Sequence, residues 1–159
     1  MSARYPLQGL LELREKRTED ARLTVKEKTQ LLQAAVSAEN KARAQLSQYI
    51  QWKAQEISRR YSAIMEQVLT QNELSIFNAG IASLDLKQLQ LEQAAEAAAL
   101  AVQSARQALD SAKDQLSKLN KARQKLEFHR GIWQVQQHSL MEYQAEQELE
   151  DFNVKKPDL

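Results

Sequence analysis

Few residues in this sequence have the types and spacing that chemistry requires. Cysteine is absent, so neither a disulfide nor a thiolate ligand is available. The two histidines, His129 and His138, are nine residues apart, so they lack the four-residue spacing that places two ligands on one helix face. We expect structural roles for both histidines, and neither a metal ion nor another cofactor.

Acidic side chains are numerous, but the elements needed to turn them into an active site are missing. A pair of long helices offers no concave pocket that could desolvate a carboxylate and shift its pKa. The sequence also lacks a phosphate-binding glycine loop and a nucleophile elbow. We therefore expect no enzymatic activity.

The composition favours helices along the whole chain. Only 3 Gly and 2 Pro occur among 159 residues, and no proline lies between Leu7 and Lys156. Ala, Leu, Gln, Glu, Lys and Arg dominate and are strong helix formers, whereas β-branched and aromatic residues are too sparse for several strands. The sequence predicts an all-α fold.

The net charge and the hydropathy of the sequence indicate which environment and which classes of partner the protein would have. A net charge of +1 lacks the basic excess that phosphate contacts require, which argues against nucleic acid. No apolar run reaches the length of a membrane span, and Met1–Pro6 lack the apolar centre of a signal peptide. We expect a cytoplasmic protein that does not insert into the membrane.

The second half of the chain carries apolar residues at heptad spacing. Alternating steps of three and four residues from Leu91 give Leu91, Ala94, Ala98, Ala101, Ala105, Ala108, Ala112, Gln115, Leu119, Ala122, Leu126, His129, Trp133, Gln136, Leu140 and Tyr143. A 3.5-residue period held over this length is typical of a left-handed coiled coil. Gly131 within this stretch is compatible with a bend, a close approach by a partner, or simple tolerance.

The first half shows a weaker pattern with a change of phase. One phase contains Leu11, Thr18, Ala21, Val25, Leu32, Ala35, Ala42, Leu46 and Tyr49, interrupted by Arg14, Lys28 and Glu39. The apolar residues that follow are Ile50, Ala54, Ile57, Tyr61, Ile64 and Val68. This shift predicts a stutter that locally unwinds the supercoil.

A break between the two patterns predicts that the chain folds back on itself. Asn78-Ala79-Gly80 has turn chemistry, and Ser83 could cap a second helix with Asp85 in its first turn. We expect a single domain over residues 1–159, a long two-stranded antiparallel coiled-coil hairpin. Its helices would span residues about 6–71 and about 84–151, with a bend over about 72–83 and a disordered tail over 152–159.

Charge and exposed apolar residues suggest how this hairpin would pair. A bend near Asn78 would set Arg14 and Arg17 close to Glu142 and Glu146, and such flanking pairs fix helix orientation. Internal pairing of this kind favours a monomer. Apolar residues at the bend would be left for a partner protein to cover.

Several segments, in this order along nearly the full length, carry a resemblance to a known family. They are Tyr5-Pro6-Leu7, Leu10, Leu13-Arg14, Glu15-Lys16-Arg17, Tyr49-Ile50-Gln51-Trp52-Lys53, Arg60-Tyr61, Leu74-Ser75-Ile76-Phe77-Asn78, Ala122-Arg123-Gln124-Lys125-Leu126-Glu127, and Trp133 with the glutamate-rich stretch through Glu150. With these segments the chain resembles the central-stalk proteins of bacterial type III secretion systems, which include FliJ and YscO.

The resemblance implies a stalk that couples the hexameric export ATPase to the cytoplasmic domain of the export gate, with secretion chaperones bound by some members. It implies an ATPase-binding end at Arg14, Arg17, Glu142 and Glu146. It implies a gate-binding end at Leu46, Tyr49, Phe77, Ile81 and Leu84. The alternatives are a coiled-coil scaffold or chaperone escort outside secretion, and a self-assembling structural rod. The sequence leaves open whether a flagellar or a virulence system is served.

Overall fold

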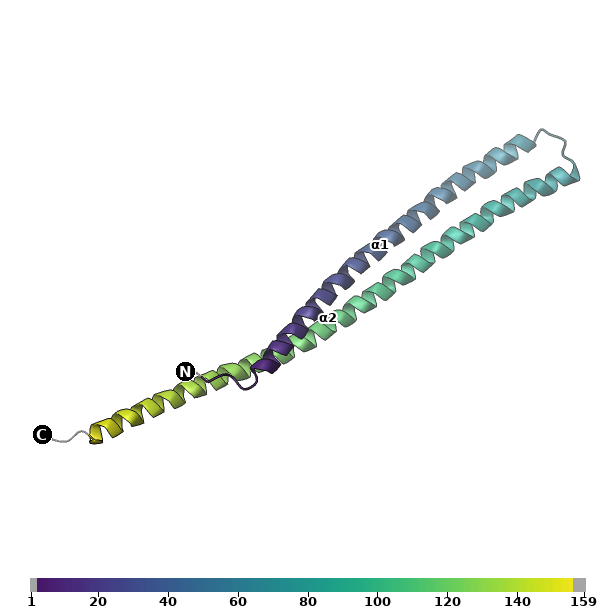
Figure 1. Ribbon diagram of the computed structural model, residues 1–159. Helices are drawn as coiled ribbons and strands as arrows, with labels where there is room; N and C mark the ends of the chain where they lie inside the picture. The colour runs from purple at the N-terminus through teal and green to yellow at the C-terminus, as the bar shows by residue number, and fades with distance from the viewer. Residues whose placement is uncertain (1–2, 156–159) are drawn as a thin grey trace. The chain divides into compact units, whose positions relative to one another are not determined.

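The computed structural model describes residues 3–155 and contains two helices in that range. Helix α1 spans Gln8–Ile64 and helix α2 spans Gln71–Lys155, with residues 65–70 between them (Figure 1). No strand occurs among the described residues. The predicted all-α helical hairpin is confirmed.

Contacts within the chain fall into two units. One unit is Lys26–Ser111, and the other combines Met1–Val25 with Ala112–Leu159. Each unit contains a stretch of α1 beside an antiparallel stretch of α2 (Figure 1). Because each unit has only two helices, few side chains are fully enclosed, and the buried residues follow one stripe on each helix.

The buried stripe of α1 keeps one phase along the helix. Its buried and half-buried positions include Leu11, Arg14, Thr18, Ala21, Val25, Lys28, Leu32, Ala35, Glu39, Ala42, Leu46, Tyr49, Lys53, Glu56 and Arg60. The phase predicted through Tyr49 is confirmed. The predicted shift at Ile50 is wrong, because only Ile57 and Ile64 among its six positions are half-buried and the original phase continues. Ile50 and Tyr61 are 42% and 47% exposed, while Lys53 and Glu56 occupy the stripe. These polar residues can lie in the stripe because both are paired: Lys53 forms an ion pair with Asp85 of α2, and Glu56 forms one with Arg60.

The buried stripe of α2 also has heptad spacing, but half of the predicted positions are displaced. The stripe contains Phe77, Ile81, Leu84, Gln88, Leu91, Ala95, Ala98, Val102, Ala105, Leu109, Ala112, Leu116, Leu119, Arg123, Leu126, Arg130, Trp133 and Gln137. Every second predicted position from Leu91 to Trp133 lies in the observed stripe. Each position between them was predicted one residue too early, so that Ala101, for example, was predicted where the stripe contains Val102. The structure buries Val102 and Leu109 rather than Ala101 and Ala108, since larger side chains remove more apolar surface from water.

The bend lies earlier in the chain than predicted. Helix α1 ends at Ile64 and α2 begins at Gln71, so the predicted bend at 72–83 is wrong and falls inside α2. A capping box starts α2: the Glu73 amide donates to Thr70 Oγ1, and the Thr70 amide donates to Glu73 Oε2, both at 3.2 Å. Satisfying these free amides favours a helix start here over one at Ser83.

The ends of the helices differ from the prediction as well. Helix α1 starts at Gln8 and stops at Ile64 rather than near residue 71. Residues 152–155 continue α2, so the predicted disordered tail is wrong for them. The rest of that tail, 156–159, lies outside the described residues.

Candidate partner-binding surfaces

The segment before α1 is anchored to α2 by an aromatic contact. Tyr5 is only 5% exposed and clusters with Leu11, Leu126 and Trp133. Its ring centroid lies 5.3 Å from that of Trp133, and its hydroxyl is hydrogen-bonded to His129 Nδ1 at 2.5 Å. His129 therefore contacts the segment before α1, whereas the buried stripe passes through Arg130.

The predicted ATPase-binding residues do not meet one another. Arg14 is half-buried and its Nη1 donates to the backbone oxygen of Ala122 at 2.9 Å, while Arg17 is exposed. Glu142 and Glu146 are exposed, and Glu142 Oε1 lies 3.0 Å from His138 Nε2 on the same helix. The predicted pairing of these arginines with these glutamates is wrong, because the earlier bend moves Arg14 opposite Ala122.

Helix α2 continues beyond the point where the segment before α1 contacts it. Ala3 still lines a groove with Trp133 and Met141. From residue 138 to residue 155 every side chain is exposed, including Leu149 and Phe152 at 63% and 66%. We call residues 138–155 the α2 extension. It presents both apolar and acidic side chains to solvent.

The predicted gate-binding residues line the contact between the helices of the Lys26–Ser111 unit. Tyr49 donates from its hydroxyl to the Leu84 backbone oxygen at 2.8 Å, and Leu84 is 8% exposed. Phe77 is half-buried with its ring centroid 5.1 Å from that of Tyr61, and Ile81 is also half-buried. Leu46 is half-buried as well, beside a shallow groove. The sequence pattern left Phe77, Ile81 and Leu84 uncovered because it placed the bend too late. Leu46 and Tyr49 were already predicted to lie in the apolar stripe of the first helix, and only the family resemblance gave them a gate-binding role.

Other apolar residues near the bend do face solvent. Met65, Val68 and Ile76 are 83%, 101% and 65% exposed. We call these three residues the bend patch. The bend patch could have been located from the Thr70–Glu73 capping-box spacing, which marks the start of α2 and hence the position of the turn.

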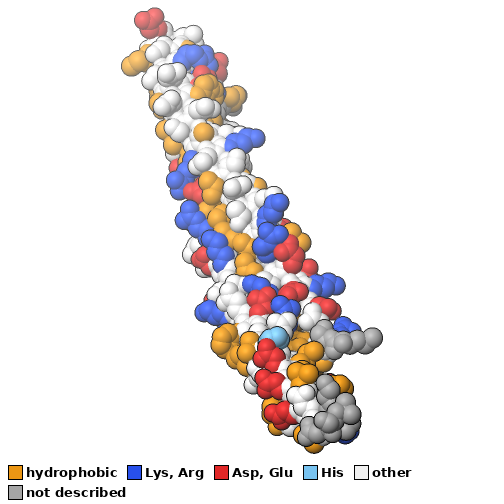
Figure 2. Space-filling view, turned by 90° about the vertical axis from the view of Figure 1, so that its left-hand side faces the viewer, with side chains coloured by type: hydrophobic (Ala, Val, Ile, Leu, Met, Phe, Trp, Pro, Cys, Tyr) orange, Lys and Arg blue, Asp and Glu red, His pale blue; other side chains and the backbone are white. Residues whose placement is uncertain are grey.

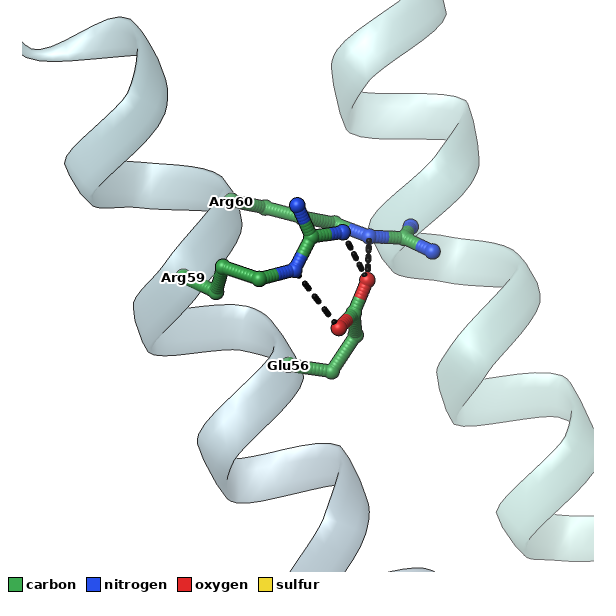
Figure 3. Close-up of polar contacts among 3 residues, drawn as sticks. All are labelled: Glu56, Arg59 and Arg60. Carbon is green, nitrogen blue, oxygen red and sulfur yellow. Dashed lines mark hydrogen bonds and ion pairs between the residues drawn. The ribbon is translucent and has the colours of Figure 1, made fainter.

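A charged cluster lies on α1 close to the bend. Arg59 donates from Nε and Nη2 to Glu56 at 2.9 and 2.5 Å, and Arg60 Nε donates to Glu56 at 3.0 Å (Figure 3). The hydrogen bonds from Arg59 and then Arg60 lower the pKa of the Glu56 carboxyl from 4.5 to about 2. One turn earlier, Lys53 Nζ lies 2.5 Å from Asp85 Oδ1 on α2. These ionic contacts replace apolar packing at this part of the stripe.

The described residues contain no group of side chains arranged to bind a metal ion. Within residues 3–155 no three side chains of the His, Cys, Asp and Glu types lie close enough to hold a metal ion. No helix in the described part of the chain is both long enough and apolar enough to cross a membrane. What the geometry does offer is exposed surface at the bend and along the α2 extension.

Comparison with known proteins agrees with these features. The family model described as "Type III secretion protein YscO" matches residues 7–155. A solved structure of CT670 from Chlamydia trachomatis, a proposed YscO homologue, superposes with a TM-score of 0.78 at 22% identity. The match covers 96% of this chain and 94% of that one, and at this identity it shows a shared fold. No curated protein sequence matches this chain. Because the family model covers nearly the whole sequence, the chain belongs to the YscO family of type III secretion proteins.

Proposed function

We propose that this protein is the central stalk of a type III secretion export apparatus, working on its cytoplasmic side. It would couple the hexameric export ATPase to the export gate without a reaction of its own. The observation that carries the proposal is the α2 extension, an 18-residue stretch of helix whose side chains are all exposed. A single unpaired helix is narrow enough to enter a ring opening, and family membership in type III secretion supplies the context.

The ATPase-binding end is assigned to the α2 extension together with Arg17. Glu142 and Glu146 on the extension and Arg17 on α1 are exposed. Within residues 3–155 no ion pair engages Arg17 or Glu146, and Glu142 contacts only His138, one turn away on the same helix. Contacts made by exposed charges are individually weak and screened by salt, which suits a shaft that must not lock onto one subunit of a ring. Arg14 would act indirectly, because its guanidinium holds the Ala122 backbone oxygen.

The test is a pull-down and an activity measurement with the cognate ATPase. Truncation before Glu142 and the charge reversal Arg17→Glu should each weaken ATPase capture and reduce stimulation of ATP hydrolysis. Arg106→Glu is the matched control, since Arg106 is an exposed arginine in the Lys26–Ser111 unit. Undiminished capture by both variants, at low and at high salt, would contradict this assignment.

The gate-binding end is assigned to the bend. The bend patch supplies the exposed apolar contact, and Tyr49, Phe77, Ile81 and Leu84 hold the helices that carry it. Apolar patches exposed to solvent mark protein contact sites, and the three residues of the bend patch all lie in or next to the turn between the helices. Leu46 lines a separate exposed groove with Ile50, further from the bend along α1.

A binding measurement with the cytoplasmic domain of the gate distinguishes residues that would contact the gate from residues that only hold the two helices together. The variant Met65→Ser with Val68→Ser should lose gate binding and keep the wild-type melting temperature. Phe77→Ala should lower both gate binding and the melting temperature, because the Phe77 ring packs against Tyr61. Gate binding that survives loss of the bend patch would move the site to the Leu46 groove. Secretion chaperones are further candidate partners, and the same two variants test them.

A further inference from the structure

The outer face of α2 carries a second stripe with heptad spacing in addition to the buried one. The stripe consists of Lys121, Lys125, Phe128, Ile132, Val135, Ser139, Glu142, Glu146 and Leu149, all exposed. Each of its positions from Lys121 to Ser139 lies two residues beyond a buried position, and two residues rotate a helix by about 200°. The stripe therefore faces away from α1, and we call it the outer stripe.

The centre of the outer stripe is apolar and open. Phe128, Ile132 and Val135 are 73%, 43% and 67% exposed. They line a shallow groove together with Gly131 and Gln136. A Cβ atom built on Gly131 would meet nothing within 4 Å, so another helix could approach the backbone closely there. Contiguous exposed apolar residues at heptad positions are the signature of a helix that packs against a further helix.

The two ends of the outer stripe carry opposite charge. Lys121 and Lys125 precede the apolar centre, whereas Glu142 and Glu146 follow it. Within residues 3–155 no ion pair engages Lys121, Lys125 or Glu146, while Glu142 approaches His138. Figure 2 shows a row of acidic side chains close to a histidine, with apolar side chains nearby. The two lysines and the two glutamates lie at matching distances along the helix on either side of the point midway between Ile132 and Val135.

This symmetry identifies one occupant. We propose that the outer stripe binds the outer stripe of a second copy of this chain, running antiparallel. Aligning Ile132 of each copy with Val135 of the other also aligns Lys125 with Glu142. The same alignment sets Lys121 opposite Glu146, so four ion pairs flank one apolar centre. A parallel arrangement would instead place lysine against lysine and glutamate against glutamate, which disfavours pairing.

Self-association through the outer stripe is separate from the proposed stalk function and does not depend on it. The internal pairing of the hairpin favours a monomer, whereas the outer stripe adds a concentration-dependent dimer to it. A two-fold contact of this kind is self-complementary, so it closes after two copies and does not grow into a filament. Pairing would cover Glu142 and Glu146, so a dimer could not present them to another partner at the same time.

Sedimentation velocity of the purified full-length chain tests the proposal. We expect the mass to rise from 18.2 kDa at low micromolar concentration towards twice that value at submillimolar concentration. The rise should be smaller at high salt, because ion pairs flank the contact. Val135→Ser should weaken association by about tenfold, since burial of an apolar side chain is lost. Leu100→Ser is the matched control, because Leu100 is 60% exposed but lies outside the stripe.

A charge swap decides the orientation. Lys125→Glu alone and Glu142→Lys alone should each abolish the mass increase, because each creates like-charge contacts. The double variant Lys125→Glu with Glu142→Lys should restore it, because every swapped pair is again opposite in charge. The variants change only exposed side chains, so helix content measured by circular dichroism should equal that of the wild type. A monomer at every concentration, or a swap that restores nothing, overturns the proposal.

Discussion

Tyr5 shows how much a single residue can contribute in a fold with so little enclosed core. It is buried against Leu11, Leu126 and Trp133, and its hydroxyl is bonded to His129. Tyr5→Phe should cost about 0.5–1.5 kcal/mol in the free energy of unfolding, because it removes one hydrogen bond and keeps the ring. Tyr5→Ala should cost about 3 kcal/mol or more, since it also empties the aromatic site.

Urea unfolding followed by circular dichroism measures both Tyr5 variants. Tyr143→Phe is the matched control, because Tyr143 is 58% exposed and its hydroxyl bonds only to Gln147 on the same helix. Its stability should equal that of the wild type. Equal losses for Tyr5→Phe and Tyr143→Phe would mean that the hydrogen bond to His129 does not form in solution.

Glu56 should make the stability depend on pH in acid. Its pKa in the folded chain is about 2, lowered by hydrogen bonds from Arg59 and Arg60, against 4.5 for a free carboxyl. A lowered folded pKa stabilises the fold at pH values above 4.5, and this contribution is lost as the pH falls towards 2. Glu56→Gln should therefore flatten the loss of stability between these two pH values.

Thermal melts at a series of acidic pH values test this dependence. Glu66→Gln is the control, because Glu66 is exposed and takes part in no ion pair within residues 3–155. It should leave the acid transition unchanged. A Glu56→Gln protein with the same acid transition as the Glu66→Gln protein would show that the bonds to Arg59 and Arg60 are not stabilising.

At the scale of the element, the register of α2 can be tested with paired substitutions. Leu109 is 7% exposed and Leu100 is 60% exposed. Leu109→Ala should cost about 2–5 kcal/mol, as expected for a buried leucine, and Leu100→Ala much less. Likewise Ala105→Leu should destabilise by about 1–3 kcal/mol through overpacking, while Ala101→Leu should be close to neutral because Ala101 is exposed. Equal effects within either pair would mean that the buried stripe follows another phase.

Helix pairing was predictable from the sequence, but its phase and bend were only partly so. Heptad spacing from Leu11 to Tyr49 located the buried stripe of α1, because apolar residues there outnumber polar ones. Between Leu91 and Ala112 every position of both possible phases is apolar, so spacing alone could not choose between them. Side-chain size could have done so, since Val102, Leu109 and Leu116 all belong to the phase that the structure buries.

The bend was misplaced because local turn chemistry was weighed above helix capping. Asn78-Ala79-Gly80 lies within α2, where a Cβ atom on Gly80 would come within 3.3 Å of Arg60 Nη1. Gly80 thus accommodates a neighbouring side chain rather than a turn. The Thr-x-x-Glu pattern at Thr70–Glu73 was the better signal for a helix start. The predicted pairing of Arg14 with distant glutamates failed for this reason alone.

At the scale of the whole molecule, stability is unevenly distributed along α2. Residues 84–126 bury side chains against α1 at regular intervals, whereas the α2 extension buries none. A helix without tertiary packing is only marginally stable in water, so it opens far more often than a packed one. The extension is therefore the part of the molecule that a partner can stabilise most.

Hydrogen exchange measured at low micromolar concentration, where self-association is minimal, turns this difference into a prediction. In the free protein, amides of residues 139–155 should exchange several orders of magnitude faster than those of residues 84–126, because only helix–coil opening protects them. Adding the export ATPase should slow exchange in residues 139–155 and leave residues 65–76 unchanged. Adding the cytoplasmic domain of the gate should do the reverse. If both partners protect the same segment, the two ends do not divide the binding between them, and a stalk that bridges ATPase and gate is excluded.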